Sequence, residues 1–391
     1  MLTETEKEKL DKCIGKTVNE IETPALIVDL DIMERNMDKM MRFLSKGTVG
    51  IRPHAKTHKT PPIARMQVEK GAIGITCATI GEAEVLVDGG IKDVLVTNRI
   101  VGTGKVRRAT SLAKKATLRV SVDSMENVKE LALAAQDQGV IIGIVVEVDI
   151  GNKRSGVRTE DEAVDIARFA ELSSNLRYDG IMGYEGHCVF INDLAEREKC
   201  ARLAYERLFF YKEALASKGL PPSIVTAGGT GSYLFAGSTE GITDIQAGSY
   251  VFMDTRYAGV EGIDFEQSLT VISTIVSHPE EDLYICDAGL KSMSKEFGLV
   301  TALPSYGLEV MSMSEEYVRL APKEDSELSA PHYMVDLDSK YASGTCLGIG
   351  RKIHLVPSHC CTTVNLHDFV YGIRKGIVKS IWCVAGRARS S

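Results

Sequence analysis

Apolar runs and amphipathic segments alternate along residues 48–255 of this chain. Eight short runs are rich in β-branched residues and have few polar positions, which is typical of strands buried in a parallel sheet. We predict these strands at 48–51, 72–79, 93–98, 117–123, 141–150, 178–186, 223–229 and 243–254. The intervening segments predict helices at 62–70, 81–88, 105–115, 126–138, 160–172 and 194–218.

Two of these helices have a recognisable start. Ser124 and Thr159 each place a side-chain oxygen just ahead of early acidic residues, as N-cap residues do. Eight βα units within about 200 residues predict a TIM-type (β/α)8 barrel. An open doubly wound sheet is the alternative, because periodicity alone does not separate the two architectures.

The pattern changes near residue 265, where strand-like runs separated by turns replace the long helical segments. These runs cover 269–276, 283–287, 352–356, 369–373 and 377–384, and they predict a mostly β C-terminal domain. Residues 24–30 precede the first barrel unit and are expected to join this domain. We therefore predict a barrel over 26–260, and a β domain formed by 1–25 together with 261–391.

Composition and charge narrow the classes of function. The chain has 391 residues and a net charge of −7. We find no basic stripe in the sequence that could bind a phosphate backbone, and we therefore expect no nucleic-acid partner. No apolar run reaches the ~18 residues of a membrane span, and the charged N-terminus lacks a signal-peptide core. Nine scattered cysteines do not form a disulfide framework. We expect a cytoplasmic protein in which most cysteines are buried thiols.

The most distinctive stretch is Arg52-Pro-His-Ala-Lys-Thr-His-Lys59, at the carboxyl end of the first predicted strand. In a barrel, functional residues occupy these strand ends. Lys56 stands between His54 and His58, and cationic neighbours and removal from water both favour the neutral, nucleophilic form of a lysine amine. The block thus predicts a nucleophile or Schiff-base former. A solvated basic turn is the alternative interpretation.

A glycine-rich turn, Gly228-Gly-Thr-Gly-Ser232, follows the seventh predicted strand. Such a turn can present backbone N–H groups to an anion. Together with Gly248 and Ser249 on the eighth strand, it occupies the usual position of the phosphate site in a TIM barrel. An ordinary turn is the alternative. A phosphate site combined with an activated lysine points to pyridoxal 5′-phosphate (PLP).

Arg154 follows the fifth predicted strand and could meet the pyridine nitrogen of PLP. An arginine there keeps that nitrogen unprotonated and weakens the electron sink. A surface ion pair with Asp149 or Glu147 is the alternative. The sixth strand ends in Tyr184 and His187, which adds a further histidine at this end of the predicted barrel.

A further group of candidate ligands lies in the predicted β domain, in Pro357-Ser-His-Cys-Cys361. In an extended strand, His359 and Cys361 would project from the same face. Imidazole and thiolate together suit Zn²⁺, and two protein ligands would leave positions open for water and substrate. From the residues alone, packing of both side chains in the core is the alternative.

Taken together, these segments resemble the PLP-dependent D-threonine aldolase and D-serine dehydratase family, nearly end to end from residue 23 to Trp382. The motifs that carry the resemblance are the 52–59 block, Arg154-Ser-Gly, the 228–232 turn, the 246–254 stretch, Asp287-Ala-Gly-Leu-Lys291 and Pro357-Ser-His. The resemblance implies the alanine-racemase architecture known as fold type III, in which a barrel is joined to a β domain.

The resemblance also implies roles for individual residues. Lys56, with His54 beside it, would form the Schiff base with PLP, and Arg154 would face the ring nitrogen. The remaining PLP-binding residues would be Tyr184, Gly229, Thr230, Gly231, Ser232, Gly248, Ser249 and Tyr250. A divalent metal, Zn²⁺ in preference to Mn²⁺ or Mg²⁺, would be bound by His359 and Cys361. A homodimer acting on a small D-amino acid is expected.

The chain combines features of both branches of this family. The 228–232 turn and the Met253-Asp-x-x-Tyr stretch are similar to the aldolases. Cys361 stands where aldolases have Asp, and Ala78-Thr79 replaces their Gln-Lys pair, which is closer to the dehydratases. Phe190 replaces the histidine proposed as the aldolase base, so His187 is the nearest candidate. Tyr317 replaces a further usual histidine.

We predict a PLP- and metal-dependent lyase for D-3-hydroxy amino acids. In retro-aldol cleavage to glycine and an aldehyde, His187 or metal-bound water would remove the hydroxyl proton. A dehydratase that converts D-serine or D-threo-3-hydroxyaspartate into a 2-oxo acid and ammonia would need the same residues. An amino-acid racemase would keep Lys56 but need no metal, and a non-catalytic PLP-binding protein would need neither the metal pair nor Arg154.

Overall fold

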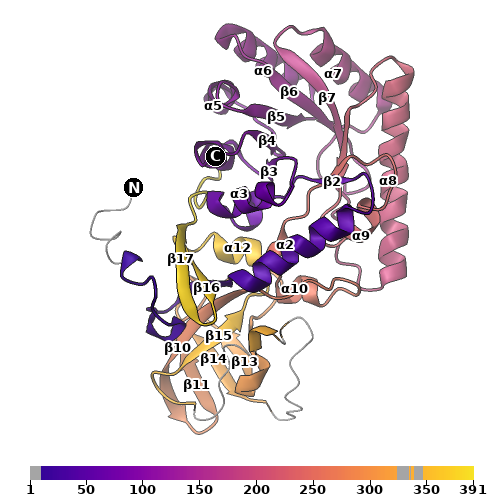
Figure 1. Ribbon diagram of the computed structural model, residues 1–391. Coiled ribbons are helices and arrows are strands. Elements are labelled where there is room, and N and C mark those ends of the chain that lie inside the picture. Colours follow the sequence, from indigo (N-terminus) through magenta and orange to yellow (C-terminus); the bar gives the residue numbers. More distant parts are fainter. Residues whose placement is uncertain (1–9, 324–333, 335, 339–346) are drawn as a thin grey trace. The chain divides into compact units, whose positions relative to one another are not determined.

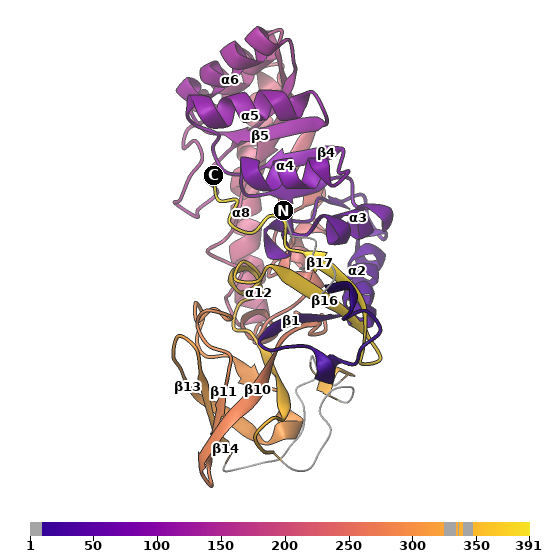
Figure 2. The ribbon, with the colours of Figure 1, turned by 90° about the vertical axis from the view of Figure 1, so that its left-hand side faces the viewer.

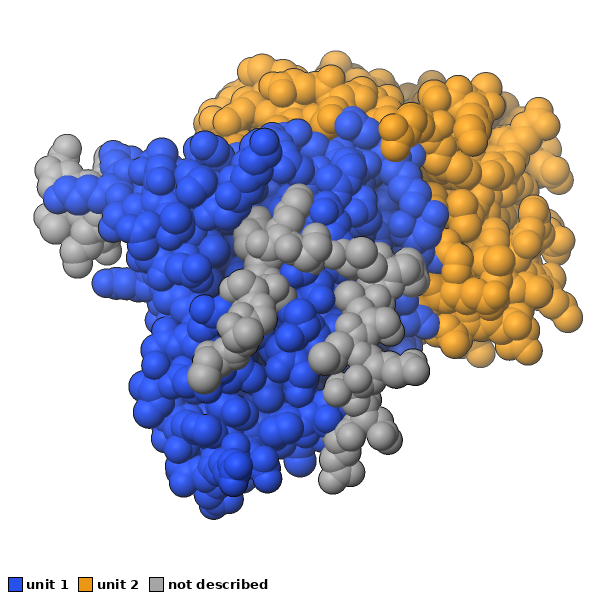
Figure 3. All heavy atoms as spheres, turned by 60° about the horizontal axis from the view of Figure 1, so that its bottom comes forward, with its two compact units in different colours: residues 1–39, 249–259, 263–387 blue, residues 40–248, 260–262, 388–391 orange. Residues whose placement is uncertain are grey.

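The computed structural model describes residues 10–323, 334, 336–338 and 347–391. The chain forms two compact units, coloured separately in Figure 3. Unit 1 contains residues 1–39, 249–259 and 263–387, and unit 2 contains residues 40–248, 260–262 and 388–391. Within the described ranges, no helix is both long enough and apolar enough to span a bilayer.

The sheet of unit 2 has eight parallel strands in the order β2-β9-β8-β7-β6-β5-β4-β3 (Figure 1). Their bounds are β2 (Gly50–Ile51), β3 (Ile75–Cys77), β4 (Asp93–Val96), β5 (Thr117–Val122), β6 (Ile142–Glu147), β7 (Leu176–Met182), β8 (Ile224–Ala227) and β9 (Asp244–Ile245). A parallel bridge between His54 and Thr76 links the two ends of this order. The predicted barrel is therefore confirmed, and the open sheet is excluded.

The helices of unit 2 follow the strands as predicted. They are α3 (Pro61–Glu69), α4 (Ile80–Asp88), α5 (Thr103–Ala113), α6 (Met125–Gln138), α7 (Glu160–Leu172) and α8 (Leu194–Ser217). Consecutive helices from α3 to α8 pack against one another. Ser124 accepts the backbone N–H of Asn127, and Thr159 forms a capping box with Glu162, so both predicted helix starts are confirmed.

The sheet of unit 1 runs in the order β13-β14-β11-β10-β1-β16-β17 (Figure 2). In addition, β15 pairs with β10 and β12. The strands are β1 (Ala25–Asp29), β10 (Leu269–Glu280), β11 (Leu283–Cys286), β12 (Thr301–Ala302), β13 (Leu308–Met313), β14 (Val318–Pro322), β15 (Lys352–Val356), β16 (Phe369–Arg374) and β17 (Ile377–Cys383). β1 pairs antiparallel with β10 and parallel with β16. Its side chain Ile27 packs with Ile272 and Ile373 from these neighbours.

Besides short 3₁₀ turns, several described elements were not predicted from the sequence: β12, β13, β14, the long helix α2 (Leu30–Leu44) and the short helices α9 (Tyr233–Ala236), α10 (Thr255–Ala258) and α12 (Cys360–Val364). β1 runs directly into α2 without a loop, so the apolar run at 24–30 hides the helix start. The signal is Asp29, whose buried carboxylate accepts the backbone N–H of Ile32 at 3.0 Å.

A row of alternating charges links several strands of the barrel. Arg52, which follows β2, pairs with Asp93 of β4, and its Nε lies 4.0 Å from Asp244 of β9. Arg119 of β5 pairs with Asp93 at 2.5 Å and with Asp179 of β7 at 2.8 Å. Burial raises the pKa of the Asp244 carboxyl, and the charge of Arg52 opposes this rise. Arg52 therefore compensates the buried Asp244 and the partly buried Asp93.

Replacing Arg52 by Met should lower the free energy of unfolding by about 3–5 kcal/mol, because Asp93 and Asp244 would lose a cation in a largely buried setting. The matched control is Arg202→Met, which breaks the exposed pair with Glu198 on α8 and should cost less than about 1 kcal/mol. Urea unfolding measures both. Equal losses for the two variants would contradict a structural role for the row of charges.

Candidate active site

The 52–59 block folds into a tight turn after β2. Residues Ala55–Thr57 form the 3₁₀ helix η2, and Nδ1 of its N-cap residue His54 accepts the backbone N–H of Lys56 at 3.4 Å. Arg52 is buried in the row of charges, and Lys59 pairs with the buried Glu82. The interpretation as a solvated basic turn is therefore wrong. Lys56 itself is exposed, so the expected removal of its side chain from water is not observed.

His54 is neutral in the folded chain. Burial lowers the pKa of His54 well below its ordinary value of 6.5, and the charges of Lys56, Lys59 and Arg154 act in the same direction. A neutral ring leaves Nδ1 able to accept the N–H of Lys56, which fixes the start of the turn that carries the lysine.

Tyr184 follows β7 and brings two other predicted residues together. The guanidinium of Arg154 lies over its ring, 5.5 Å from the ring centroid. A Cβ atom added to Gly229 would lie 3.4 Å from Cε2 of the same ring. Arg154, Tyr184 and the glycine turn are therefore neighbours within unit 2.

The alternative for Arg154, a surface ion pair, is not observed among the described residues. Glu147 is paired with Arg99 and also accepts a hydrogen bond from Ser155 at 2.8 Å. Asp149 accepts two backbone N–H groups of its own loop at 3.0 Å each. Both acids are thus engaged elsewhere, and Arg154 stacks on Tyr184 instead.

Close neighbours explain two of the predicted glycines. A Cβ on Gly231 would overlap the backbone carbonyl of Val189, and a Cβ on Gly248 would lie 2.8 Å from the carbonyl oxygen of His54. Gly248, which follows β9, therefore lies directly against the turn that carries Lys56. An exposed amine, a bare backbone turn and an arginine stacked on an aromatic ring form a donor set that fits PLP.

Three further predicted site residues have other neighbours. Ser249 and Tyr250 belong to unit 1, where Oγ of Ser249 lies 3.7 Å from Sγ of Cys361 and the ring of Tyr250 packs on Phe265. His187 is exposed in unit 2, where its Nε2 would lie 3.1 Å from a Cβ on Gly151.

One expectation about the cysteines is corrected. Among the described cysteines, only Cys77, Cys286 and Cys360 are buried thiols, so the expectation that most would be is wrong. Cys13, Cys361 and Cys383 are at least partly exposed, and Cys188 and Cys200 form a disulfide with a sequence separation of 12. The bond could not be predicted from the separation of 12 positions between the two cysteines. This spacing does not show whether helix α8 packs against the segment after β7.

The candidate metal centre lies in unit 1, at the start of α12 (Cys360–Val364). The segment is helical after His359, so the prediction of an extended strand is wrong. His359, Cys360 and Cys361 nevertheless place possible ligand atoms within 4.8 Å of one another. Cys360 is fully buried and Cys361 is partly exposed, so Cys361 is the thiol that an ion can reach together with His359.

Asp254, to which the sequence pattern assigned no role, organises this centre. Its buried Oδ2 accepts the Nδ1–H of His359 at 3.0 Å and the backbone N–H of Cys360 at 2.9 Å. Its Oδ1 accepts the N–H of Tyr257 and caps α10 (Thr255–Ala258). Because Nδ1 keeps its proton, which it donates to Asp254, Nε2 is the nitrogen from which a metal would displace a proton, as in carboxylate–histidine–metal triads.

The same carboxylate sets the protonation of His359. Burial alone would lower the pKa of His359, but the hydrogen bond to Asp254 and the proximity of Cys361 outweigh burial and raise it to about 10. The signal that identifies Asp254 is an acid immediately before a short helix, in the Met253-Asp pair at the end of the eighth barrel unit.

Comparisons with known proteins identify the family of this chain. The alanine racemase N-terminal domain model matches residues 28–256, and a putative serine dehydratase domain model matches residues 268–373. The chain is 34% identical to the 3-hydroxy-D-aspartate aldolase of Paracoccus denitrificans, over 96% of this chain and 94% of that one. The chain belongs to the D-threonine aldolase and D-serine dehydratase family.

Relatives in both branches of this family are similar over most of the chain. The crystal structure of D-threonine aldolase from Filomicrobium marinum has a TM-score of 0.89 and 33% identity, covering 97% of this chain and 98% of that one. The D-threo-3-hydroxyaspartate dehydratase of Delftia sp. is 29% identical over 89% of this chain and 93% of that one. One structure of a D-threo-3-hydroxyaspartate dehydratase is the metal-free form of a mutant in which alanine replaces a cysteine.

The buried, neutral His54 predicts a pH dependence of stability. Its folded pKa lies below its unfolded value, so the unfolded chain takes up a proton first as the pH falls. The free energy of unfolding should therefore fall by up to about 1.4 kcal/mol per pH unit below about pH 6.5. His54→Asn, which keeps an acceptor for Lys56, should flatten this slope in urea unfolding of the PLP-free protein. The exposed His278→Asn is the control, and a variant at His54 with the unaltered slope would refute the assignment.

Proposed function

We propose that this chain is a PLP- and metal-dependent lyase that cleaves D-3-hydroxy amino acids to glycine and an aldehyde. The observation that carries the proposal is the presence in one chain of an exposed Lys56, on a turn that lies against Gly248, and of an Asp254–His359–Cys361 centre. The similarity to aldolases of 3-hydroxy-D-aspartate and D-threonine supports the same reaction.

The residues of unit 2 would hold PLP. Nζ of Lys56 is the amine for its aldehyde carbon, the 228–232 turn and Gly248 receive its phosphate, and Arg154 with Tyr184 adjoins its ring. When bound, PLP supplies an electron sink for the charge that develops at the substrate α-carbon. The neutral His54 keeps the lysine turn in place through its Nδ1.

The residues of unit 1 would hold the metal. Nε2 of His359 and Sγ of Cys361 are its ligands, and this combination favours Zn²⁺ over Mn²⁺ or Mg²⁺. When bound, the ion supplies a Lewis acid for the 3-hydroxyl of the substrate. Asp254 holds the Nδ1 proton of His359 and so keeps the ring in one tautomer and orientation.

Cleavage of the Cα–Cβ bond requires removal of the 3-hydroxyl proton. We assign this step to Nε2 of His187, the exposed imidazole that follows β7. The buried His54 is unsuited to it, because its Nδ1 is engaged with the backbone N–H of Lys56. Phe190, at the position of the usual aldolase base, has no group that takes up a proton.

Dehydration to a 2-oxo acid and ammonia is the second candidate. It is favoured by Cys361, which matches the dehydratase pattern, and by the similarity to D-threo-3-hydroxyaspartate dehydratase. In that reaction Nζ of Lys56 would remove the α-proton. A racemase or a non-catalytic PLP-binding protein would have no use for the Asp254–His359–Cys361 centre. From the family resemblance we also propose a homodimer that works in the cytoplasm.

The reaction is decided by one incubation of the PLP-loaded protein with D-threonine, D-threo-3-hydroxyaspartate or D-serine, with and without chelator. Aldehyde, glycine, 2-oxo acid and ammonia are assayed together. We expect aldehyde and glycine, lost on chelation, and no product from the Lys56→Ala control. Oxo acid with ammonia would establish the dehydratase instead. Turnover that survives complete metal removal would contradict both reactions as proposed.

Asp254→Asn should weaken metal binding about 10- to 100-fold, because an amide does not accept the His359 and Cys360 hydrogens as a carboxylate does. An Asn side chain still caps α10, so the fold should be retained. The control is Asp193→Asn, which changes the equivalent N-cap of α8 away from the centre. Competition with a chromogenic chelator measures both affinities. Unchanged affinity in Asp254→Asn would show that this carboxylate does not support the metal.

A further inference from the structure

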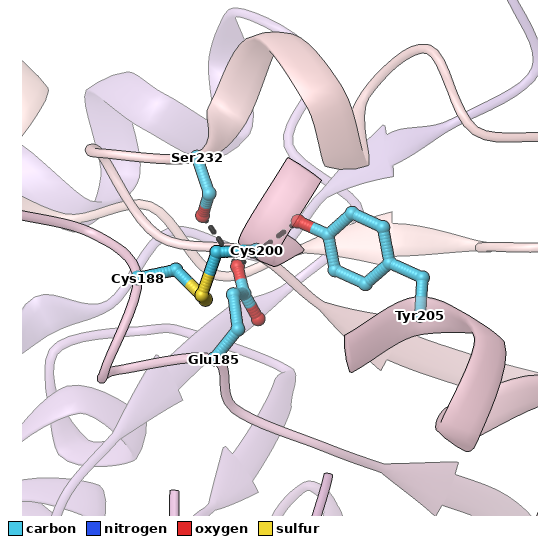
Figure 4. The surroundings of a disulfide bond; sticks show 5 residues. All are labelled: Glu185, Cys188, Cys200, Tyr205 and Ser232. Carbon is cyan, nitrogen blue, oxygen red and sulfur yellow. Dashed lines mark hydrogen bonds between the residues drawn. A yellow bond between two sulfur atoms is a disulfide. The ribbon is translucent and has the colours of Figure 1, made fainter. Parts of the chain in front are cut away.

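Glu185 is a buried acid to which the proposed reaction gives no task. It follows Tyr184 after β7, and its side chain is fully buried beside the Cys188–Cys200 disulfide (Figure 4). A carboxylate in such a place is costly unless donors surround it. Three donors do so here. They are the hydroxyl of Ser232, the hydroxyl of Tyr205 at 3.1 Å and the backbone N–H of Gly228 at 3.3 Å.

Two of these donors are the first and last residues of the glycine turn. Gly228 donates to Oε2 of Glu185 and Ser232 donates to Oε1, so one carboxylate holds both ends of the turn. The middle of the turn is fixed by the same segment, since the carbonyl of Val189 lies against Gly231. Residues 185–189 thus form the base on which the turn rests.

The hydroxyl of Ser232 is fully used by these contacts. It has a single hydrogen, which it donates to Glu185, and its oxygen accepts the backbone N–H of Gly229 at 3.0 Å. A phosphate placed in the turn would therefore not receive the Ser232 hydrogen. Ser232 therefore supports the turn from within. The backbone N–H groups of Gly228, Gly229 and Ser232 also donate inside the protein, so an anion would meet the turn at the backbone of Gly231.

Two further contacts fix the position of Glu185 itself. The disulfide joins the segment that carries Glu185 to α8, and α8 supplies Tyr205, the third donor (Figure 4). Burial raises the pKa of Tyr205 well above its ordinary value, and the negative charge of Glu185 adds to the rise. The phenol therefore stays protonated and donates throughout the working pH range.

We propose that Glu185 is the positioning residue of the phosphate turn: it sets the turn through Gly228 and the Ser232 hydroxyl, and it makes Ser232 a support of the turn and not a phosphate donor. This inference rests on the proposed binding of PLP. It concerns affinity for the phosphate group of the cofactor, and it assigns Glu185 no contact with substrate.

The test compares PLP with pyridoxal, which has the same aldehyde but no phosphate. Both are titrated into the cofactor-free chain and followed by absorbance. Glu185→Gln leaves one acceptor for three donors, so it should weaken PLP binding about 10- to 100-fold and leave pyridoxal binding unchanged. Glu185→Asp, which keeps the charge and shortens the reach, should show the same selective loss and serves if the Gln variant does not fold.

A double-mutant cycle separates support from direct contact. Ser232→Ala alone should weaken PLP binding, and the Glu185→Gln/Ser232→Ala double variant should lose little more than either single variant. Additive losses, or a loss in Ser232→Ala without one in Glu185→Gln, would show that Ser232 binds phosphate directly and would overturn the proposal. Tyr205→Phe keeps both links to the turn and is the control, with PLP affinity close to that of the unaltered chain.

Failure of the proposed function and failure of this inference give different results. If the unaltered chain bound no PLP, both would be wrong. If it bound PLP and the two Glu185 variants bound PLP equally well, the role of Glu185 alone would be wrong. Equal weakening of PLP and pyridoxal would point to a general collapse of the site and would also overturn that role.

Discussion

A carboxylate that leaves water has to be surrounded by donors, and this requirement shapes both centres of the chain. Asp254 in unit 1 and Glu185 in unit 2 are fully buried, and each accepts hydrogen bonds from three groups. The donors include backbone N–H groups, so the surrounding main chain converges on the acid. Each centre is thereby preorganised by its own protein contacts.

The barrel could be predicted because strands that are buried on both faces of a parallel sheet have continuous apolar sequences. The run Ile142–Glu147 is apolar at nearly every position, as strands of a covered parallel sheet are, and the strand ends then located Lys56, Arg154 and the 228–232 turn. Where burial alternates weakly, as in Leu308–Met313, the strand was missed. Where a strand passes straight into a helix, as at Asp29, the boundary was missed.

The partners of the site residues could not be predicted in the same way. Glu185 and Ser232 are 47 positions apart, and Asp254 and His359 are 105 apart, so no local pattern joins them. His359 and Cys361 illustrate the difference. Their residue types predicted a metal centre, and an extended strand was expected to project both side chains from one face. The segment is instead the first turn of a helix. The residue types therefore indicated the chemistry of this centre, but they did not indicate its geometry.

Some departures from the aldolase pattern serve the architecture of this chain. Thr79 stands where the aldolases have a lysine, and it is the N-cap of α4. Its hydroxyl also donates to the carbonyl of Arg389 at 2.5 Å, and Gly81 lies close to the carbonyl of Ser391. Residues 388–391 belong to unit 2 and are held at this helix start. Thr79 therefore helps to hold residues 388–391 at the start of α4.

β1 is made early in synthesis, but both of its partners come after the whole barrel in the chain. All eight barrel strands leave the ribosome between β1 and β10, and β16 emerges later still. The barrel can complete its own pairing during this interval, because its contacts lie within the finished stretch. β1, a strand buried at all five positions, has to wait with unpaired edges until its neighbours appear. Translation therefore imposes an order in which the unit that contains His359 and Cys361 is the last to close.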